Sequence, residues 1–318
     1  MEAAAGQTAQ TAQTGQDGRD VLVVGESLVD VVRGPDGTTR EHAGGSAANV
    51  AVALARLGRP VRFATAYAED ERGALVARHL AAAGVELATD PAVVARTSTA
   101  LATIGTGGAA TYEFDLSWEL GPVTDEPAPL HVHTCSLGAV VAPGAEDVAA
   151  LLRRLRDRAT VTYDVNARPA VTGTGADVVA RVERVAALAD LVKASDEDLA
   201  ALWPDLDEAS AVAHLLALGP AAVVVTRGAE GAAWTTGRCS VEVASLPVEV
   251  ADTIGAGDTF GAALVDALWE RGLLGADRRE ELAGVAEDVV AEVLEHAARA
   301  AAVTVSRPGA DPPYRHEL

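Results

Sequence analysis

Near the C-terminal end of the chain, the stretch DTIGAGDTFGAAL (252–264) combines small residues with two carboxylates. Apolar residues beyond Gly257 fall on one helical face, so a helix is predicted to begin within GAGD. The first amides of a helix lack intrahelical partners and lie at the positive end of its dipole. Because Gly255, Ala256 and Gly257 have little or no side chain, a phosphate can approach these amides closely, and the amides together form an anion cradle. Asp258, at the edge of this anion cradle, could accept a proton from a hydroxyl that attacks the phosphate.

Lys193 is the sole lysine of the chain, and this limits how a nucleotide could bind. It is not preceded by GxxxxG and does not follow a glycine-rich loop in the protein-kinase arrangement, so both of those phosphate sites are excluded. Backbone amides, arginine and Mg²⁺ would have to neutralise the phosphates instead. The GAGD stretch suits that arrangement, although an ordinary helix start with an acid in its first turn has the same sequence pattern.

The composition limits the class of protein and its partners. The 318 residues suffice for one large domain or two modest ones, and 49% of them are apolar. Aromatic residues make up 3%, so the core must consist of Ala, Val and Leu. A net charge of −21 opposes binding to nucleic acid or to a membrane surface. With two cysteines and no apolar run of the ~18 residues that a membrane span needs, we expect a cytoplasmic protein with reduced thiols.

Short apolar runs alternate with helical patterns along most of the chain. Strands are predicted within 20–26, 60–68, 130–140, 160–167, 190–195 and 221–228, and helices within 46–58, 70–87, 145–158, 175–189 and 207–218. This alternation predicts an α/β domain with a mostly parallel central sheet and helices on both faces.

Three other parts of the chain depart from the alternation. Segments 28–43 and 97–120 alternate polar and apolar residues around glycine-rich turns and predict a small β lid. Residues 1–19 lack large apolar side chains after Met1 and predict a disordered tail. The domain is therefore expected to span residues 20–313, with 314–318 as a C-terminal tail.

Two long motifs resemble those of a known family. AGGSAANVAVALARLG (43–58) is similar to the N-terminal signature of PfkB-type, or ribokinase-like, carbohydrate kinases, and DTIGAGDTF to their C-terminal signature. They stand in the expected order, and the likeness runs from about Val21 to Pro313. The resemblance implies a ribokinase-like fold that uses ATP and Mg²⁺ to phosphorylate a sugar hydroxyl. It makes Asp258 the base and the amides of residues 255–258 the anion hole.

The resemblance also implies which residues hold the sugar, since such kinases bind it between the core sheet and the lid. The positions that match the family's sugar contacts are Asp30, Gly44, Gly45 and Asn49. In addition, DVNAR (164–168) resembles the DxNxR stretch of fructokinases and 2-keto-3-deoxygluconate kinases, which implies that Asp164, Asn166 and Arg168 face the cleft.

Further positions match the nucleotide and cation sites of the family. For the nucleotide these are Thr226, Gly228 and Gly231, together with Gly255, Gly257 and, at the adenine edge, His296. Ser195 and Asp198 replace the Asn and Glu of the family's NxxE motif and would organise Mg²⁺ through water. Asp252, with the loop 305–309, would hold a monovalent cation such as K⁺. By contrast, His131 and His133 lack a nearby third ligand and are expected to be structural.

The acceptor is left open among several alternatives. The motifs most resemble fructokinase, which makes fructose 6-phosphate, and 2-keto-3-deoxygluconate kinase is the close rival. An acid sugar would require more cations near the lid than Arg33, Arg40 and Arg96, so a neutral sugar is favoured. A nucleoside is less favoured because the lid offers few aromatic faces. A sugar or nucleotide sensor without catalysis is the alternative of another class, and a homodimer through the lid is expected because exposed sheet edges tend to pair.

Overall fold

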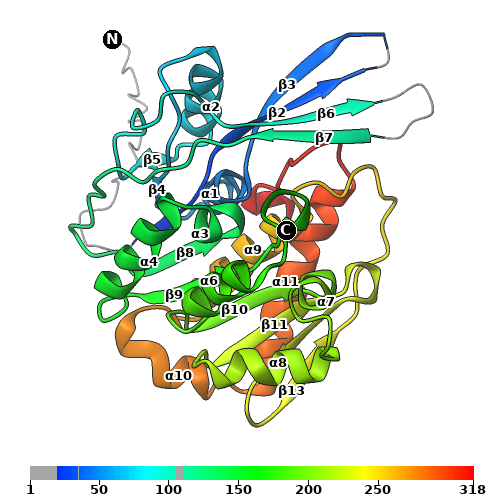
Figure 1. Cartoon of the computed structure of the whole chain (residues 1–318). Coiled ribbons are helices and arrows are strands. Elements are labelled where there is room, and N and C mark those ends of the chain that lie inside the picture. The colour runs from blue at the N-terminus through cyan, green and yellow to red at the C-terminus, as the bar shows by residue number, and fades with distance from the viewer. Residues whose placement is uncertain (1–19, 35, 105–109) are drawn as a thin grey trace, which may run out of the picture.

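The computed structural model describes residues 20–34, 36–104 and 110–318, and these form two β-sheets joined in one domain (Figure 1). In this part of the chain the larger sheet has nine strands, in the order β13-β12-β11-β10-β9-β8-β1-β4-β5. They are β1 (Val21–Val24), β4 (Val61–Ala64), β5 (Glu86–Leu87), β8 (His131–Cys135), β9 (Thr160–Asp164), β10 (Leu191–Ser195), β11 (Ala222–Thr226), β12 (Ala232–Thr235) and β13 (Ser240–Val243).

Seven of these strands, from β5 to β11, run parallel to their neighbours, and β12 and β13 add an antiparallel edge. The predicted, mostly parallel central sheet is therefore confirmed. The smaller sheet has the order β3-β2-β6-β7 and forms the predicted lid. Its strands are β2 (Leu28–Arg33), β3 (Thr39–Gly44), β6 (Thr99–Ile104) and β7 (Ala110–Asp115).

Helices cover both faces of the larger sheet. One face packs against α1 (Ser46–Arg56), α2 (Glu71–Ala82), α9 (Ala256–Glu270), α10 (Arg279–Ala283) and α11 (Glu287–Val305). The other packs against α3 (Ser136–Val140), α4 (Gly144–Leu155), α6 (Ala176–Ala186), α7 (Asp196–Leu202) and α8 (Glu208–Ala217). Short turns complete the chain: α5 (Pro169–Thr172), η1 (Gly228–Glu230), η2 (Ala276–Arg278) and η3 (Arg315–Glu317). No helix of the described ranges is long and apolar enough to cross a membrane.

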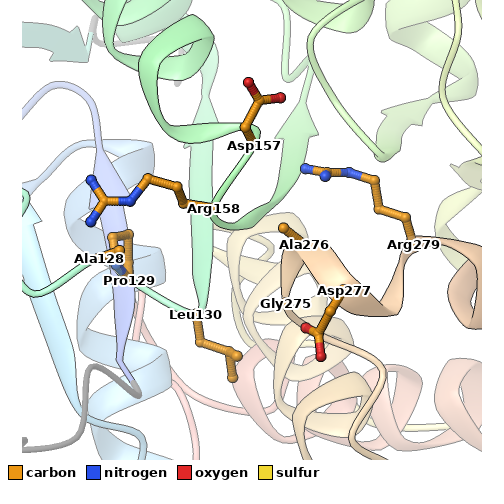
Figure 2. Close-up of a pocket in the computed structure, with 9 residues that line it drawn as sticks. All are labelled: Ala128, Pro129, Leu130, Asp157, Arg158, Gly275, Ala276, Asp277 and Arg279. Atoms are coloured by element: carbon orange, nitrogen blue, oxygen red, sulfur yellow. The ribbon is translucent and has the colours of Figure 1, made fainter.

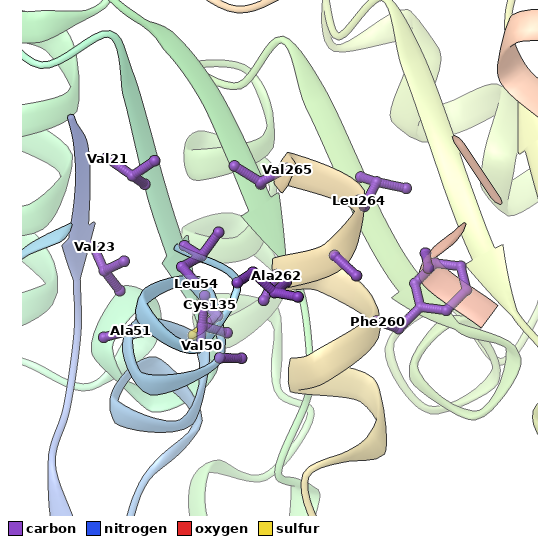
Figure 3. Close-up of a cluster of buried hydrophobic side chains, with 14 of the residues drawn as sticks. Val21, Val23, Val50, Ala51, Leu54, Cys135, Phe260, Ala262, Leu264 and Val265 are labelled. Carbon is purple, nitrogen blue, oxygen red and sulfur yellow. The ribbon is translucent and has the colours of Figure 1, made fainter. Parts of the chain in front are cut away.

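The core consists mainly of small aliphatic side chains, as the composition predicts. In β1, Val21 and Val23 face one helical layer while Leu22 and Val24 face the other, because side chains alternate along a strand. Figure 3 shows α9 lying against α1 over the first of these faces. Three alanines and one glycine of α9 are buried, and such small side chains let the two helices lie close together.

The last residues of the chain belong to the folded domain and do not form the expected tail. The guanidinium of Arg315 donates to the carbonyl of Leu57 at 2.6 Å, and Leu318 packs against the core. The side chain of Glu317 accepts from the amide of Tyr314 at 2.8 Å. The predicted disordered tail, 1–19, lies outside the described residues.

Parallel strands place their carboxyl ends at one edge of a sheet, where ligands of open α/β sheets usually bind. Here that edge carries the turns after β1, β9, β10 and β11, and the lid rises above it (Figure 1). The helix α9 begins at the same edge, so the fold brings GAGD to the residues predicted to hold a sugar.

Candidate active site

A cleft of about 320 Å³ opens between the lid and the carboxyl edge of the larger sheet. Its lining comes from five regions: the turn after β1 with the lid, the start of α1, the start of α3, the turn after β9, and the start of α9. The residues are Glu26, Leu28, Asp30, Gly45, Ser46, Asn49, Ala100, Phe114, Ser136, Leu137, Asn166, Arg168, Thr253, Ile254, Gly255, Gly257 and Asp258. Most of the predicted sugar-site and cradle residues therefore meet in one place.

Gly255 is the N-cap of α9 and has φ +75°, a left-handed conformation that favours glycine. A β-carbon at this position would come within 2.7 Å of the β-carbon of Ala310, so space as well as conformation requires glycine. Gly257 and Asp258 occupy the first helical turn, where amides have no intrahelical acceptor. The amide of Ala256 already donates to the carbonyl of Thr253 at 3.3 Å, so the cradle depends mainly on the two following amides.

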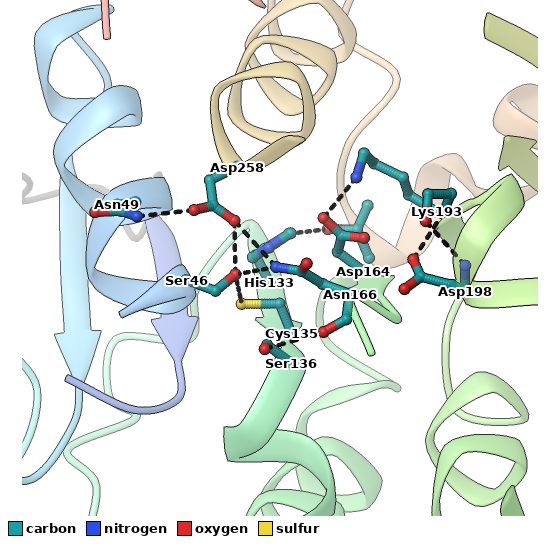
Figure 4. A network of polar contacts seen from close by, with 12 residues as sticks. Ser46, Asn49, His133, Cys135, Ser136, Asp164, Asn166, Lys193, Asp198 and Asp258 are labelled. Carbon is teal, nitrogen blue, oxygen red and sulfur yellow. Dashed lines mark hydrogen bonds and ion pairs between the residues drawn. The ribbon is translucent and has the colours of Figure 1, made fainter. Parts of the chain in front are cut away.

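Three neutral side chains hold the carboxylate of Asp258, which is 6% exposed (Figure 4). The hydroxyl of Ser46 donates to Oδ1 at 2.7 Å, and the amide of Asn49 donates to Oδ2 at 2.8 Å. The amide of Asn166 reaches both Oδ1, at 3.2 Å, and the hydroxyl of Ser46, at 2.8 Å. Asn49 and Asn166 thus contact the predicted base directly, and Asp258 is fixed at the floor of the cleft.

Sequence reasoning missed Ser46 because a serine in the first turn of a helix usually signals a cap. It also missed Glu26, which lines the cleft and is buried. The carboxyl group of Glu26 accepts from the amides of Ser46, at 3.2 Å, and Gly138, at 2.7 Å. Burial raises the pKa of Glu26 to about 7, against the lowering effect of hydrogen bonds from its own backbone amide and that of Gly138. Glu26 therefore links α3 to the start of α1, where Ser46 contacts the base.

The carboxyl group of Asp30 projects from β2 over the cleft. A β-carbon at Gly44 on the paired strand β3 would collide with this carboxyl group, which explains the glycine there. Burial raises the pKa of Asp30 to about 6; the charge of Asp258 raises it further, while His42 and Arg168 oppose the rise. Near neutral pH the group is ionised and can accept hydrogen bonds from sugar hydroxyls.

The DVNAR stretch divides between the cleft and the interior. Asn166, at φ 38°, turns the chain so that its amide and the guanidinium of Arg168 line the cleft. Arg168 is exposed and donates to the side-chain oxygen of Asn166 at 2.6 Å. Asp164 does not line the cleft as predicted: it is 1% exposed, and its Oδ2 accepts from Lys193 at 2.7 Å. The alternation of side chains along β9 explains this, since Asp164 lies on the face that α9 covers.

Ser195 and Asp198 form a capping box at the start of α7. Each side chain accepts from the other's amide, at 3.0 Å and 2.8 Å. The second oxygen of Asp198 accepts from the amide of Ala167 at 2.7 Å, so this acid also fixes the turn that carries Asn166. Within the described residues, no group of three or more His, Cys, Asp or Glu is placed to hold a metal.

The loops predicted to hold the nucleotide lie at the carboxyl end of β11. Thr226 ends that strand, and Gly228 and Gly231 both have positive φ, at 51° and 102°. A side chain at Gly231 would collide with the carbonyl of Val243 on the neighbouring strand. Arg227 pairs with Glu208 at 2.7 Å and fixes this turn against α8.

His296 lies away from the cleft lining and has a structural partner. Its Nε2 is 2.9 Å from Oδ2 of Asp266, a buried acid of α9 that also pairs with Arg59 and Arg315. His296 thus bonds α11 to α9, and its predicted contact with the adenine edge stays a prediction. Asp252 accepts from the amides of Ile254, at 3.0 Å, and Gly309, at 2.9 Å, so it holds the predicted cation loop against the start of α9.

His131 and His133 are structural, as predicted. They lie on β8 under α9; both ring nitrogens of His131 and Nδ1 of His133 are within 2.9 Å of the hydroxyls of Thr160 or Thr162. Burial lowers the pKa of each histidine to about 3, so both are neutral. Cys135 and Cys239 are free thiols.

A second hollow, of about 540 Å³, lies at the opposite, amino end of the strands (Figure 2). Its charged residues are Asp157, Arg158, Asp277 and Arg279. Arg279 donates to Asp190 at 2.6 Å and to the carbonyl of Ala159 at 2.6 Å, so its guanidinium serves the fold. Ligands of such sheets bind at the carboxyl edge, which favours the cleft beneath the lid as the active site.

Comparisons with known proteins identify the relatives of this chain. A family model described as pfkB family carbohydrate kinase matches residues 19–317. A fructokinase of Rhizobium leguminosarum bv. trifolii is 36% identical over 263 residues, which cover 78% of this chain and 79% of that protein. The solved fructokinase of Xylella fastidiosa with bound ATP has a TM-score of 0.81 at 27% identity and covers 94% of both chains. A fructokinase double mutant of Vibrio cholerae O395, bound to fructose, ADP and potassium ion, has a TM-score of 0.73 at 25% identity and covers 92% of this chain and 93% of its own.

Proposed function

Because the chain belongs to the pfkB family of carbohydrate kinases, we propose that this ATP-dependent sugar kinase phosphorylates fructose to fructose 6-phosphate, with Asp258 as the base. The observation that carries the proposal is the position of Asp258. Its carboxylate lies at the floor of the cleft, in the first turn of α9, where an acceptor hydroxyl and a terminal phosphoryl group would meet.

In the proposed reaction, Asp258 takes the proton of the acceptor hydroxyl. The hydroxyl oxygen forms a bond to the terminal phosphorus of ATP, the bond from that phosphorus to the bridging oxygen breaks, and ADP leaves with the electron pair. Amides of Gly257 and Asp258 stabilise the charge on the transferred group, and Arg168 at the cleft wall assists. The lid closes over the sugar and excludes water, which would otherwise accept the phosphoryl group.

Mg²⁺ would accompany the phosphates of ATP and neutralise part of their charge. Asp198 can take part through water, because a carboxylate with two amide donors still has free lone pairs. The hydroxyl of Ser195 is engaged as the cap of α7 and supports this acid. For K⁺, the oxygens would come from Asp252 and from the backbone of the 305–309 loop, as expected from the sequence. The similar fructokinase of Vibrio cholerae O395, which has a bound potassium ion, is a precedent.

The charges of the cleft favour a neutral sugar over an acid sugar. Among the described lining residues, three carry carboxyl groups, Glu26, Asp30 and Asp258, and one carries a cation, Arg168. Arg96, one of the arginines in or beside the lid, is exposed and paired with Asp115 at 2.6 Å. A 2-keto-3-deoxygluconate carboxylate would add a further negative charge beside Asp30 and Asp258, whereas fructose hydroxyls can donate to Asp30.

The test is ATP turnover with a panel containing fructose, 2-keto-3-deoxygluconate, ribose and a nucleoside. We expect fructose to give the highest kcat/KM. Asp258→Asn should lower kcat by about 10³-fold or more, because the variant loses the general base and also disturbs the hydrogen bonds around it. Asp205→Asn, an exposed acid outside the cleft, is the matched control. Undiminished turnover in Asp258→Asn would refute the assignment of the base. Saturable binding of fructose without turnover in the unaltered protein would favour the sensor alternative.

A further inference from the structure

The sole lysine of the chain lies directly behind the anion cradle. Lys193 is on β10, in register with Asp164 on β9, and both side chains point to the face covered by α9. The position that a β-carbon would take at Gly257 lies 3.6 Å from the ammonium nitrogen of Lys193. At Gly261, one helical turn later, the same position lies 3.8 Å from Oδ2 of Asp164. The first turns of α9 therefore rest on this ion pair.

Stability alone is a weak reason for such a pair. Lys193 has a side chain that is 8% exposed, Asp164 is 1% exposed, and they are joined at 2.7 Å. Removing two charges from water costs so much that apolar residues of similar volume often stabilise a core as well or better. In addition, Oδ1 of Asp164 is buried without a hydrogen-bond partner among the described residues. A pair selected for stability would be expected to satisfy that oxygen.

The sign of the charge is also unfavourable for the free protein. A helix N-terminus carries a partial positive charge, and a cation beside it is destabilising. Burial alone would lower the pKa of Lys193, but the charge and hydrogen bond of Asp164 raise it, so the side chain remains an ammonium. The neighbouring His133 is neutral and adds no charge. The helix terminus and the ammonium therefore act in the same direction on any anion that binds at Gly257.

We propose that Lys193 is an electrostatic positioning residue of phosphoryl transfer: its ammonium supports the anion cradle from behind Gly257, and Asp164 holds it in place. This inference rests on the proposed function of the cradle. Binding of a phosphate at Gly257 offsets the repulsion between the ammonium and the helix terminus, and the stabilisation grows as charge develops on the transferred group. Asp164 keeps the ammonium fixed, so that little reorganisation is needed when the anion arrives.

The test compares Asp164→Asn with the double variant Asp164→Asn/Lys193→Met. The double variant contains no unpaired buried charge, and thermal unfolding should show that it folds. We expect the kcat of the double variant to be about 30-fold lower than that of Asp164→Asn, a smaller loss than the roughly 10²–10³-fold found for a direct oxyanion donor. The KM for fructose should change less than threefold. Lys193→Arg in the Asp164→Asn background should restore at least a third of the lost kcat. Equal kcat values in Asp164→Asn and in the double variant would overturn the proposal. An equal rise in the KM for fructose and the KM for ATP at constant kcat would overturn it as well.

Asp258→Asn, measured in the same series, separates the two ideas. If Asp258→Asn abolishes turnover while the lysine variants match Asp164→Asn, the proposed function stands and the role of Lys193 is refuted. If Asp258→Asn is as active as the unaltered protein, the proposed function itself fails. As a control for charge at a distance, Arg184→Gln removes an exposed partner of Glu146 and should leave kcat unchanged.

Discussion

Replacing Ser46 by alanine is the most direct test of how the base is held. The hydroxyl of Ser46 donates to Asp258 at 2.7 Å and accepts from the amide of Asn166 at 2.8 Å, so the variant removes one bond to the carboxylate and one bond that orients Asn166. The amides of Asn49, at 2.8 Å, and Asn166, at 3.2 Å, remain as donors. Asp258 should therefore stay in the cleft but lose its fixed direction.

The expected loss follows from the type of bond. A hydrogen bond to a charged group contributes about 1.5–3 kcal/mol, and the lower half of that range applies because two donors remain. Each 1.36 kcal/mol of transition-state stabilisation is tenfold in rate, so a loss of about 1.5–2.2 kcal/mol should lower kcat about 13- to 40-fold. Because Ser46 contacts the base and not the nucleotide, the KM for ATP should change less than threefold.

Steady-state kinetics with fructose and ATP measure both parameters. Ser27→Ala is the matched control, since Ser27 is also buried, is not itself a lining residue of the cleft, and has its hydroxyl bonded to Thr65 at 2.7 Å. The control should lower thermal stability and leave kcat unchanged. In the double variant Ser46→Ala/Asp258→Asn, the serine substitution should add less than threefold to the loss, because the two residues act as a unit. A kcat within twofold of the unaltered protein for Ser46→Ala would refute this account of the site.

Further predictions address the sugar site, the cradle and the histidine of α11. The pKa of Asp30 is raised to about 6 in the folded protein, so ionisation of Asp30 lowers the stability of the fold as pH rises towards and through 6. Asp30→Asn should therefore raise the melting temperature at pH 8 more than at pH 5. The same variant should raise the KM for fructose at least tenfold. In the unaltered protein that KM should rise as pH falls below 6, because the protonated carboxyl group loses acceptor capacity. Gly255→Ala should lower the melting temperature by several degrees and raise the KM for ATP, since the left-handed backbone costs about 1 kcal/mol and the methyl group meets Ala310. His296→Ala should cost about 1–3 kcal/mol of unfolding free energy, measured by urea denaturation, yet leave the KM for ATP unchanged; a selective rise in that KM would restore the adenine contact.

The sequence predicts the architecture and the centre of the site well, for physical reasons. Alternating strands and helices allow few arrangements, and glycines at 255 and 257 before a helical pattern specify a backbone that an anion can approach. The structure brings these residues to the same cleft as Asp30, Asn49 and Asn166. Local spacing predicted the anion cradle, whereas the resemblance to PfkB-type kinases supplied the sugar-site residues.

Side-chain direction within short polar stretches could not be predicted in the same way. In DVNAR, the change of direction depends on Asn166 at φ 38°, a backbone state that the residue types do not specify. One available signal was overlooked: polar residues at 160, 162 and 164 share one face of β9, and Lys193 is in register with the last of them. That alternation indicates a polar layer beneath α9 and assigns Asp164 to it. The partners of His296 and Arg315 depend on Asp266, whose burial is a tertiary property.

The charges around Asp258 suggest why its holders are neutral. Ser46, Asn49 and Asn166 orient the carboxylate by hydrogen bonds, whereas a cation paired with it would stabilise the ionised form and oppose uptake of the acceptor's proton. The buried cation of the site, Lys193, is instead paired with Asp164, on the far side of the first turn of α9. Positive charge is thereby placed where the phosphoryl group would accumulate negative charge, and neutral donors where a proton must be accepted. Exchanging these environments would weaken both the base and the anion cradle, so their placement on opposite sides of the first turn of α9 is itself a requirement of the proposed chemistry.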